Sequence, residues 1–243
     1  MFVHYRTKGL IFKKEDRGDA DQLFTVFTKE FGKLEISAKA IRKISSKLRS
    51  GAEIFYLSEI EFIQGKAQKT LTDAVLVEKF ADLKKDLGKL KIAYKISDVL
   101  DKLIRGQEPD LKIWNLILET FYGLKELKNE DGKLEIIYYY FLWNFLSILG
   151  YQPNFYHCIL CEEKLKPETL YFDLAEGGIV CESCHKKTKA KLLETEPETI
   201  KILRAILKKD WLTVKRLKIE IKNQKPLKLI SDNFLSEALD KTQ

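Results

Sequence analysis

The chain has 243 residues, of which 45% are hydrophobic and 33% are charged, and its formal net charge is +7 at neutral pH. This length and apolar content predict a folded globular protein and exclude a fully disordered chain. We expect no secretory signal, because charges interrupt the opening segment, and no membrane span, because the most apolar run covers only residues 136–149. A cytosolic protein with a polyanionic partner is therefore predicted.

The first eighty residues predict a small β-barrel. Their candidate strands are rich in β-branched and aromatic residues, are separated by glycines, and lie at 5–12, 22–28, 33–40, 53–63 and 69–80. Five strands without a long helical period favour a closed OB-type barrel, which leaves few exposed strand edges. An SH3-like barrel would give a similar pattern and remains the alternative.

After residue 80 the apolar residues recur at helical spacing. Helices are predicted at 82–106, 108–127, 132–151, 196–210, 211–223 and 226–241. The helix at 132–151 is apolar on nearly all sides, which places it at the centre of a bundle. We therefore predict an α+β protein of several domains: an OB-fold domain at 1–80 and a helical domain at 81–243, which an inserted zinc-finger segment at 155–190 interrupts.

All four cysteines lie in two C-x2-C pairs separated by nineteen residues: Cys158, Cys161, Cys181 and Cys184. Four thiolates at this spacing can complete a tetrahedral shell around zinc. The residues between the pairs predict two short strands joined near Gly177 and Gly178. A shell of four cysteines leaves no open position for water or substrate, so we expect one structural zinc ion per chain.

Two other interpretations of the cysteines remain. They could be small buried hydrophobic residues, or two redox C-x-x-C motifs, although a redox motif needs a βαβ setting that the pattern lacks. His157 and His185 are adjacent to cysteines and are expected to lie outside the metal shell or in solvent. Several lysines follow the last cysteine and either offset the thiolate charge in solvent or contact phosphate: Lys186, Lys187, Lys189 and Lys191.

A second basic segment joins two predicted strands of the barrel. It carries five cations and no acidic residue between Glu35 and Glu53: Lys39, Arg42, Lys43, Lys47 and Arg49. Such a loop on an OB-type barrel is expected to contact a nucleic-acid backbone, although a polar loop can also be merely solvated. Aromatic platforms for bases are harder to assign, because Phe55, Tyr56 and Phe62 cannot all point to one face of a strand.

Catalytic motifs are absent from the sequence. It contains no phosphate-binding G-x-x-x-x-G-K-[ST], no G-x-G-x-x-G, no H-E-x-x-H and no zinc-deaminase signature. We therefore expect a binding protein and not an enzyme. Two rival hypotheses are an enzyme of nucleic-acid metabolism whose barrel only binds substrate, and a transcription or translation factor with a zinc ribbon.

Three stretches together resemble RecO, a bacterial family of recombination mediators. They are TKGLIFKKEDRGDADQLFTVFTKEFGKLEISAKAIRK at 7–43, LGYQPNFYHCILC at 149–161, and the closing C-x2-C. The family's G-E-x-D-R motif corresponds to residues 18–22, with Gln22 in place of the arginine. Its A-(K/R)-G-x-R-(K/R) motif corresponds to residues 38–43, with Ala40 in place of the glycine.

The resemblance implies an OB fold, a helical body and, as in many members, a zinc finger. It also implies binding of single- and double-stranded DNA, annealing of complementary strands, and action with RecR in loading RecA onto DNA coated with single-strand-binding protein. The acidic tail of that protein would bind the helical body at a site that the sequence does not identify. A cytoplasmic, nucleoid-associated location in a bacterium follows from the same resemblance.

Overall fold

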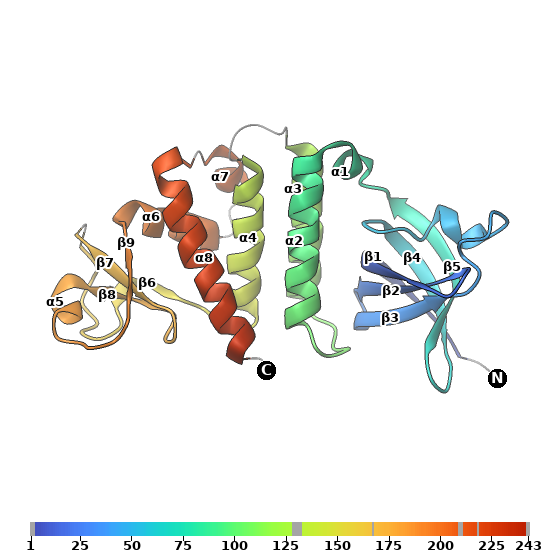
Figure 1. Ribbon diagram of the computed structural model, residues 1–243, viewed down its shortest axis with the longest axis horizontal. Coiled ribbons are helices and arrows are strands. Elements are labelled where there is room, and N and C mark those ends of the chain that lie inside the picture. The colour runs from blue at the N-terminus through green and yellow to red at the C-terminus, as the bar shows by residue number, and fades with distance from the viewer. Residues whose placement is uncertain (1–2, 128–132, 167, 209–210, 218, 242–243) are drawn as a thin grey trace. The chain divides into compact units, whose positions relative to one another are not determined.

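The computed structural model describes residues 3–127, 133–166, 168–208, 211–217 and 219–241 (Figure 1). The chain forms two compact units, residues 1–126 and 127–243. The first contains the barrel and the three helices that follow it, and the second contains the remaining helices and the cysteines. The domain boundary predicted at residue 80 stays a prediction. Within the described ranges, no helix combines the length and apolarity needed to cross a membrane.

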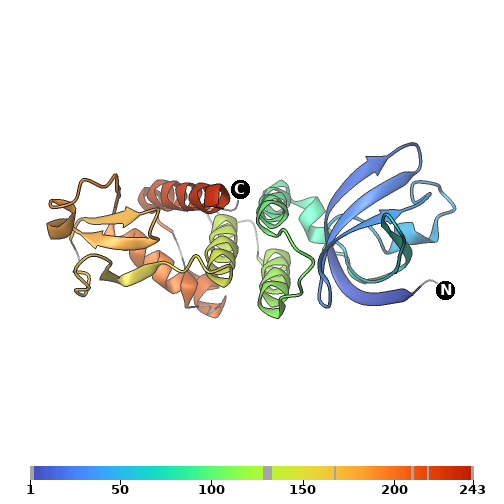
Figure 2. The same ribbon diagram turned by 90° about the horizontal axis from the view of Figure 1, so that it is seen from below.

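The barrel has five strands: β1 (His4–Arg17), β2 (Asp21–Thr28), β3 (Gly32–Ala38), β4 (Leu57–Gln64) and β5 (Lys69–Glu78). They close in the order β1-β2-β3-β5-β4, with β1 paired to β4. Figure 2 shows the strands of the barrel curving. Every pair is antiparallel except β3 and β5. This arrangement confirms the OB-type prediction over the SH3-like alternative.

The barrel interior is filled by alternating apolar residues of each strand, including Phe24, Ile36 and Ile60. Phe55, Tyr56 and Phe62 are all buried, so none of these three rings offers a platform for a base. The strand predicted from residue 53 begins later, at Leu57. Phe55 has a φ of 64° and donates its N–H to the Ile11 carbonyl, which makes residues 53–56 a turn.

Three helices follow the barrel: α1 (Ala81–Lys85), α2 (Leu87–Leu103) and α3 (Leu111–Glu126). The single helix predicted at 82–106 is interrupted at Asp86, whose backbone is extended and whose carboxylate caps α2 by accepting the N–H of Gly88 at 2.8 Å. Phe121 of α3 packs against Phe55 and Phe80, with ring centroids 5.8 and 5.6 Å apart. These aromatic contacts attach the helices to the barrel.

The second unit is built around α4 (Lys133–Ile148), which contacts α6 (Pro197–Leu207), α7 (Trp211–Arg216) and α8 (Ile221–Lys241). Nearly all of α4 is buried, which confirms its prediction as the central helix. Trp143 stacks on Phe234 of α8 and donates its ring N–H to the Ser231 hydroxyl at 2.9 Å. The tryptophan is therefore both packed and hydrogen-bonded, as a buried indole requires.

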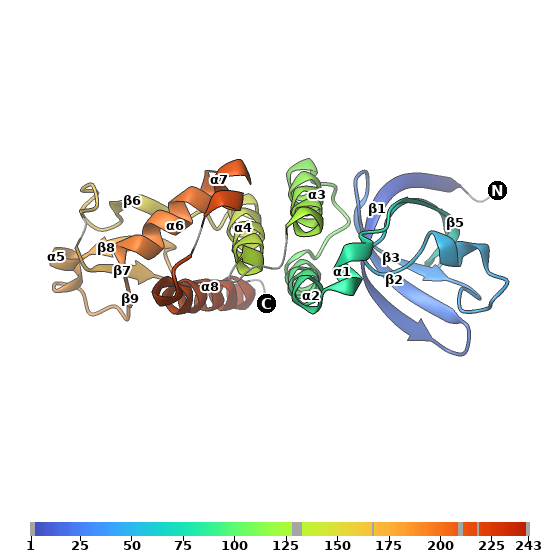
Figure 3. The ribbon, with the colours of Figure 1, turned by 90° about the horizontal axis from the view of Figure 1, so that it is seen from above.

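A small sheet carries the cysteines. Its strands are β6 (Asn154–Cys158), β7 (Leu170–Asp173), β8 (Gly178–Cys181) and β9 (Leu193–Thr195), in the order β6-β8-β7-β9, and the short helix α5 (Glu182–His185) follows β8. The predicted hairpin is confirmed in β7 and β8, whose turn ends at Gly177 with a φ of 64°. Neither β6 nor β9 was predicted. Within this unit, α5 lies at the end of the sheet away from α4 (Figure 3).

Candidate nucleic-acid interface and metal centre

The four predicted metal ligands converge at one end of the small sheet. Cys158 and Cys181 end β6 and β8, Cys161 lies in the turn after β6, and Cys184 lies in α5. Their Sγ atoms all lie within 4.8 Å of one another, and the Sγ atoms of Cys161 and Cys181 are 3.9 Å apart. Thiolates bound tetrahedrally at about 2.3 Å from an ion are about 3.8 Å apart, so the cluster could hold a metal ion.

Backbone hydrogen bonds shape the first C-x2-C turn. The N–H of Cys158 donates to the Glu163 carbonyl at 2.9 Å, and the N–H of Glu162 donates to the Cys158 carbonyl at 2.8 Å. The φ of Glu162 is 60°, in the left-handed region, so the chain turns directly after Cys161. Ile159 then packs so closely on Gly178 of β8 that a Cβ at residue 178 would lie 2.2 Å from the Cγ2 of Ile159. The glycine thus lets the turn approach β8.

The thiols of the cluster differ in acidity. Burial raises the pKa of Cys181, but hydrogen bonds from the Ser183 hydroxyl and the Cys184 backbone N–H outweigh burial and lower it to about 6. Hydrogen bonds with the thiols of Cys181 and Cys161 raise the pKa of Cys184 to about 12. A divalent cation would therefore have to displace protons from the cluster in order to bind four thiolates.

The two neighbouring histidines lie outside the cluster. The only group of potential metal ligands found among the described residues consists of the four cysteines. His157 is exposed, and the His185 ring stacks on Tyr171 with the ring centroids 3.6 Å apart. Neither histidine belongs to the group of four cysteines, and their place outside a metal shell stays a prediction.

The basic loop, residues 39–49, leaves β3 and ends in a short 3-10 helix, Lys47–Ser50. Its first turn is fixed to the barrel: the N–H of Ala40 donates to the Asp21 carboxylate at 2.7 Å, and the N–H of Arg42 donates to the Ala20 carbonyl at 3.0 Å. Ala40 has a φ of 53°, and the side chain of Ile41 is only 2% exposed. The loop is therefore an anchored element of the barrel.

All five cations of the basic loop are exposed. The Arg42 guanidinium lies 3.5 Å from the Asp16 carboxylate and 3.4 Å from the Gly18 carbonyl. In the described part of the chain, the other four have no side-chain hydrogen bond or ion pair: Lys39, Lys43, Lys47 and Arg49. The structure thus places these cations together on one loop, with four of them available to a ligand.

The predicted basic run that starts at Lys186 directly follows α5, in the other unit. Lys186 pairs with Glu182 at 2.6 Å, while Lys187 and Lys189 are exposed. An exposed pair between residues four apart on a helix contributes little to stability and leaves the lysine accessible. These residues are accessible, as the prediction requires, and a contact with DNA stays a prediction.

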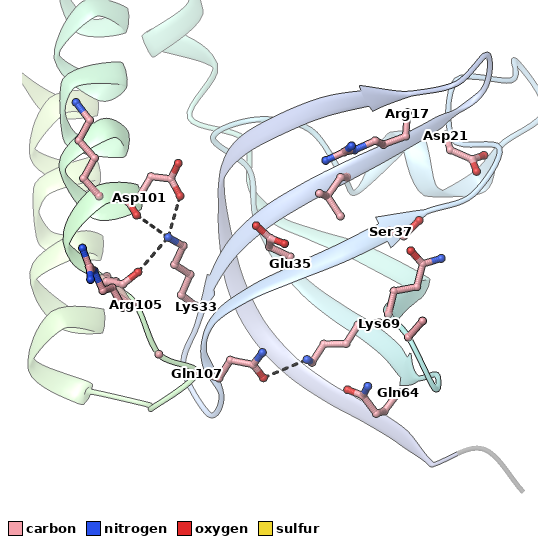
Figure 4. A pocket seen from close by; sticks show the side chains of 16 residues that line it. Arg17, Asp21, Lys33, Glu35, Ser37, Gln64, Lys69, Asp101, Arg105 and Gln107 are labelled. Carbon is pink, nitrogen blue, oxygen red and sulfur yellow. Dashed lines mark hydrogen bonds and ion pairs between the residues drawn. The ribbon is translucent and has the colours of Figure 1, made fainter. Parts of the chain in front are cut away.

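A groove that the sequence did not reveal lies on the outer face of the barrel (Figure 4). Its volume is about 970 Å³, and it is bounded by the end of β1, the start of β2, one face of β3, the β4–β5 turn, and the end of α2 with the segment after it. Its lining contains no aromatic residue among those described. The charged lining residues are Arg17, Asp21, Lys33, Glu35, Lys69, Asp101, Lys102 and Arg105.

Asp101 is neutralised by two lysines, which keeps the groove basic. Its carboxylate oxygens each lie 2.8 Å from a lysine Nζ, one from Lys13 and the other from Lys33. Burial raises the pKa of Asp101, but the hydrogen bonds from these lysines outweigh burial and hold the pKa below its ordinary value. Figure 4 shows Lys33 reaching from β3 to α2 and Lys69 reaching to Gln107.

Comparison with known proteins gives the family. The family model described as Recombination protein O N terminal matches residues 1–80, and the one described as Recombination protein O C terminal matches residues 84–243. The chain belongs to the RecO family. The match covers both units, so the resemblance seen in the sequence motifs is confirmed.

Several curated relatives in the RecO family are named DNA repair protein RecO. The relative from Dehalococcoides mccartyi (strain ATCC BAA-2266) is 29% identical over 88% of this chain and 83% of the relative. That from Desulfitobacterium hafniense (strain DSM 10664) is 27% identical over 98% of this chain and 86% of the relative. That from Desulforamulus reducens is 24% identical over 98% of this chain and 90% of the relative.

The two RecO motifs meet in the structure. Asp21, in the first motif, accepts the hydrogen bond of Ala40, in the second. Ala40 has a left-handed backbone, which a glycine would adopt without strain. One hydrogen bond thus joins residues 18–22 to residues 38–43 at the turn that begins the basic loop.

Proposed function

We propose that this chain is a non-enzymatic DNA-binding mediator of recombinational repair. It binds single- and double-stranded DNA and anneals complementary strands, and with RecR it assists loading of RecA onto DNA coated with single-strand-binding protein. It acts in the bacterial cytoplasm at the nucleoid. The observation that carries this proposal is the anchored basic loop on an OB-type barrel, in a chain of the RecO family.

The basic loop supports backbone binding that is independent of base sequence. Its four unpaired cations are exposed, so they can meet phosphates without first breaking an ion pair. Each phosphate contact releases counterions from DNA and makes the affinity steeply dependent on salt. A mediator of repair needs such binding, because damage occurs at any sequence.

The groove on the outer face of the barrel supports the binding of a single DNA strand. OB-type barrels bind oligonucleotides over the faces of their second and third strands and over the β1–β2 and β4–β5 loops. This groove is lined by β2, β3, the β4–β5 loop and the residues that flank the β1–β2 loop. Because none of its described lining residues is aromatic, we infer that the groove holds the sugar-phosphate backbone and does not stack bases.

The test is the affinity for labelled oligonucleotides at several salt concentrations. Arg42→Ala/Lys43→Ala should weaken binding to every sequence alike and reduce the slope of log K against log[salt] by about 0.7 to 0.9 per lost contact. The matched control is Lys164→Ala/Lys166→Ala, which removes the same charge from exposed positions in the other unit. Equal affinity and slope for the parent and the loop variant would contradict the loop as the DNA site.

Four further measurements test the proposal, and the first two separate the rival functions. Annealing of complementary strands distinguishes a mediator from a transcription or translation factor. Recovery of chemically unchanged oligonucleotides after incubation distinguishes it from a nucleic-acid-processing enzyme. Capture of RecR and single-strand-binding protein by the purified chain tests the two direct protein partners, and RecA loading onto coated DNA tests the complete function.

We also propose that the metal held by the four cysteines is zinc, one per chain, in a structural role. Thiolate ligands in a tetrahedral arrangement favour zinc, and a closed shell serves folding. When bound, the ion would connect the turn after β6 to β8 and α5. Metal analysis of the purified chain should find one zinc; a folded chain without zinc after strong chelation would contradict the structural role.

A further inference from the structure

Ile44 is the most exposed large apolar side chain in the described part of the protein, at 94% exposure. It lies in the middle of the basic loop, directly after Lys43. Transfer of an exposed aliphatic side chain from water to an apolar surface is favourable, so Ile44 would be stabilised by an apolar surface that covers it. Because Ile44 lies among cations, we expect that apolar surface to belong to a negatively charged ligand.

The backbone is anchored on both sides of Ile44. Ile41 is buried before it, and Leu48 packs against the barrel core after it. Between these anchors, the N–H of Lys43 donates to the Ala40 carbonyl at 3.1 Å, and the N–H of Ser46 donates to the Lys43 carbonyl at 3.0 Å. Ile44 therefore lies on an ordered turn, so little conformational entropy remains to be lost when the turn meets a ligand.

The cations around Ile44 are placed to hold a phosphate backbone. Arg42 and Arg49 border a small cavity of about 290 Å³ at the base of the loop, together with Gln22 and Tyr56. The one carboxylate in the lining of that cavity, from Glu53, is paired with Lys14 at 2.5 Å. Two arginines thus line a recess of a size that a phosphate group can enter, and Ile44 belongs to the same loop.

We propose that Ile44 is a wedge that inserts between two stacked base pairs of duplex DNA while the surrounding cations hold the backbone. This inference rests on the proposed function. In duplex DNA, apolar side chains such as isoleucine enter between base steps, partially unstack them and kink the helix. The loop supplies both parts of this interaction, namely exposed cations and an apolar side chain on the anchored turn between them.

Insertion of Ile44 and backbone binding alone predict different base stacking and different dependence on salt. Phosphate contacts by lysine and arginine leave the bases stacked and depend on salt. Insertion of Ile44 would unstack bases, and its contribution would not depend on salt, because the side chain is uncharged. The two contributions can therefore be measured separately on one DNA duplex.

The experiment uses the intact chain and short duplexes that carry 2-aminopurine at successive central positions. The fluorescence of this base rises when it is unstacked. The parent chain should raise the fluorescence at saturation, whereas Ile44→Ser should abolish the rise and weaken duplex affinity by roughly tenfold with an unchanged salt slope. Ile44→Leu should restore both properties. Leu87→Ser is the matched control, since Leu87 is 84% exposed at the start of α2.

Each other outcome overturns the wedge. If Ile44→Ser gives the same fluorescence and affinity as the parent, the side chain does not insert. If it weakens binding to single strands as much as to duplexes, the contact is not with a base-pair step. DNA binding by the parent without unstacking would overturn the wedge alone, whereas no DNA binding at all would overturn the proposed function with it. Thermal unfolding of each variant verifies that the chain is folded.

Discussion

The Asp21 carboxylate accepts a hydrogen bond from the backbone N–H of Ala40 at 2.7 Å. Ala40 is in the left-handed region, with a φ of 53°, where a residue with a Cβ is strained by about 1 kcal/mol. Asp21 also lines the groove on the barrel. One side chain therefore borders the groove and fixes the start of the basic loop.

Replacing Asp21 by alanine should loosen the loop. The change leaves the N–H of Ala40 without its partner, so we expect the free energy of unfolding to fall by about 1 kcal/mol. DNA affinity should fall as well, because the loop cations lose their fixed positions. Asp19→Ala is the matched control, since it removes an equal charge from an exposed neighbouring residue. Denaturant unfolding and oligonucleotide binding measure the effects; equal DNA affinity in the two variants would contradict a positioning role for Asp21.

Substitutions at Ala40 should follow the strain of its backbone. Ala40→Gly relieves the left-handed strain but adds entropy to the unfolded chain, so we expect the free energy of unfolding to rise by between zero and about 1 kcal/mol. Ala40→Val should lower it by more than about 1 kcal/mol, because a β-branched residue tolerates this region poorly. Denaturant unfolding of the three chains gives the order. A valine variant as stable as the parent would show that residue 40 is not strained.

Removal of one cysteine ligand should destabilise the second unit. Cys161→Ser is the best choice, because Cys161 is exposed and its replacement leaves no cavity. We expect a lower metal content and a lower unfolding temperature, since the free energy of metal binding contributes to folding. Leu160→Ser, at an exposed neighbouring position, is the control. Full metal content in Cys161→Ser would remove this residue from the ligand set.

The same metal should be released by acid. The pKa of Cys184 is raised to about 12 in the metal-free cluster and that of Cys181 is lowered to about 6. Binding therefore displaces protons at neutral pH, and the apparent affinity should rise with pH and fall as protons compete for the thiolates. Titration of the metal-free chain with zinc in a weakly buffered solution should release protons. No proton release would contradict binding through all four thiolates.

The ion pairs of Asp101 with Lys13 and Lys33 should make the stability of the first unit sensitive to acid. Hydrogen bonds from Lys13 and Lys33 hold its pKa below the ordinary value of 3.8, although burial opposes them. This contribution to stability is fully present above pH 3.8 and is lost as the pH falls through the lower pKa of the folded state. Asp101→Asn should remove it, so the variant should lose less stability than the parent between neutral pH and pH below 3.8.

Asp98→Asn is the matched control for this pair. Asp98 lies on the same helix and pairs with Lys102, but its side chain is 61% exposed. Such surface pairs contribute about 0 to 1 kcal/mol, so the control should retain the acid sensitivity of the parent. Unfolding measured at several pH values compares the three chains. Identical pH profiles for Asp101→Asn and the parent would contradict the role of Asp101.

The barrel and the cysteine cluster could be predicted because their signals are local. Strand patterns and glycines mark each strand of the barrel, and C-x2-C spacing implies a turn that returns two thiols to one point. The interruption at Asp86 was missed, although an aspartate followed by a helical period is a capping signal. The strands β6 and β9 were missed because they are short and pair only with strands brought to them by the fold.

The groove could not be predicted in the same way. Its lining residues come from several strands and from α2, and only their packing places them together. One signal was present: Lys33, Glu35 and Ser37 alternate along β3 and so lie on one face of the strand. The polar residues identify that face as outward. The sequence does not predict that α2 and the segment after it lie beside this face.

The parallel pairing of β3 with β5 joins only two residue pairs, Ile36 with Lys69 and Ser37 with Thr70, whereas β2 and β3 are joined over seven. Because this pairing is so short, we expect β3 and β5 to separate before the other strand pairs when the barrel opens locally. Amide protons of β5 near Lys69 should consequently exchange with solvent faster than those of β2. Ser37 and Lys69 also line the groove. A DNA strand bound in the groove would therefore contact both β3 and β5 and should slow that exchange.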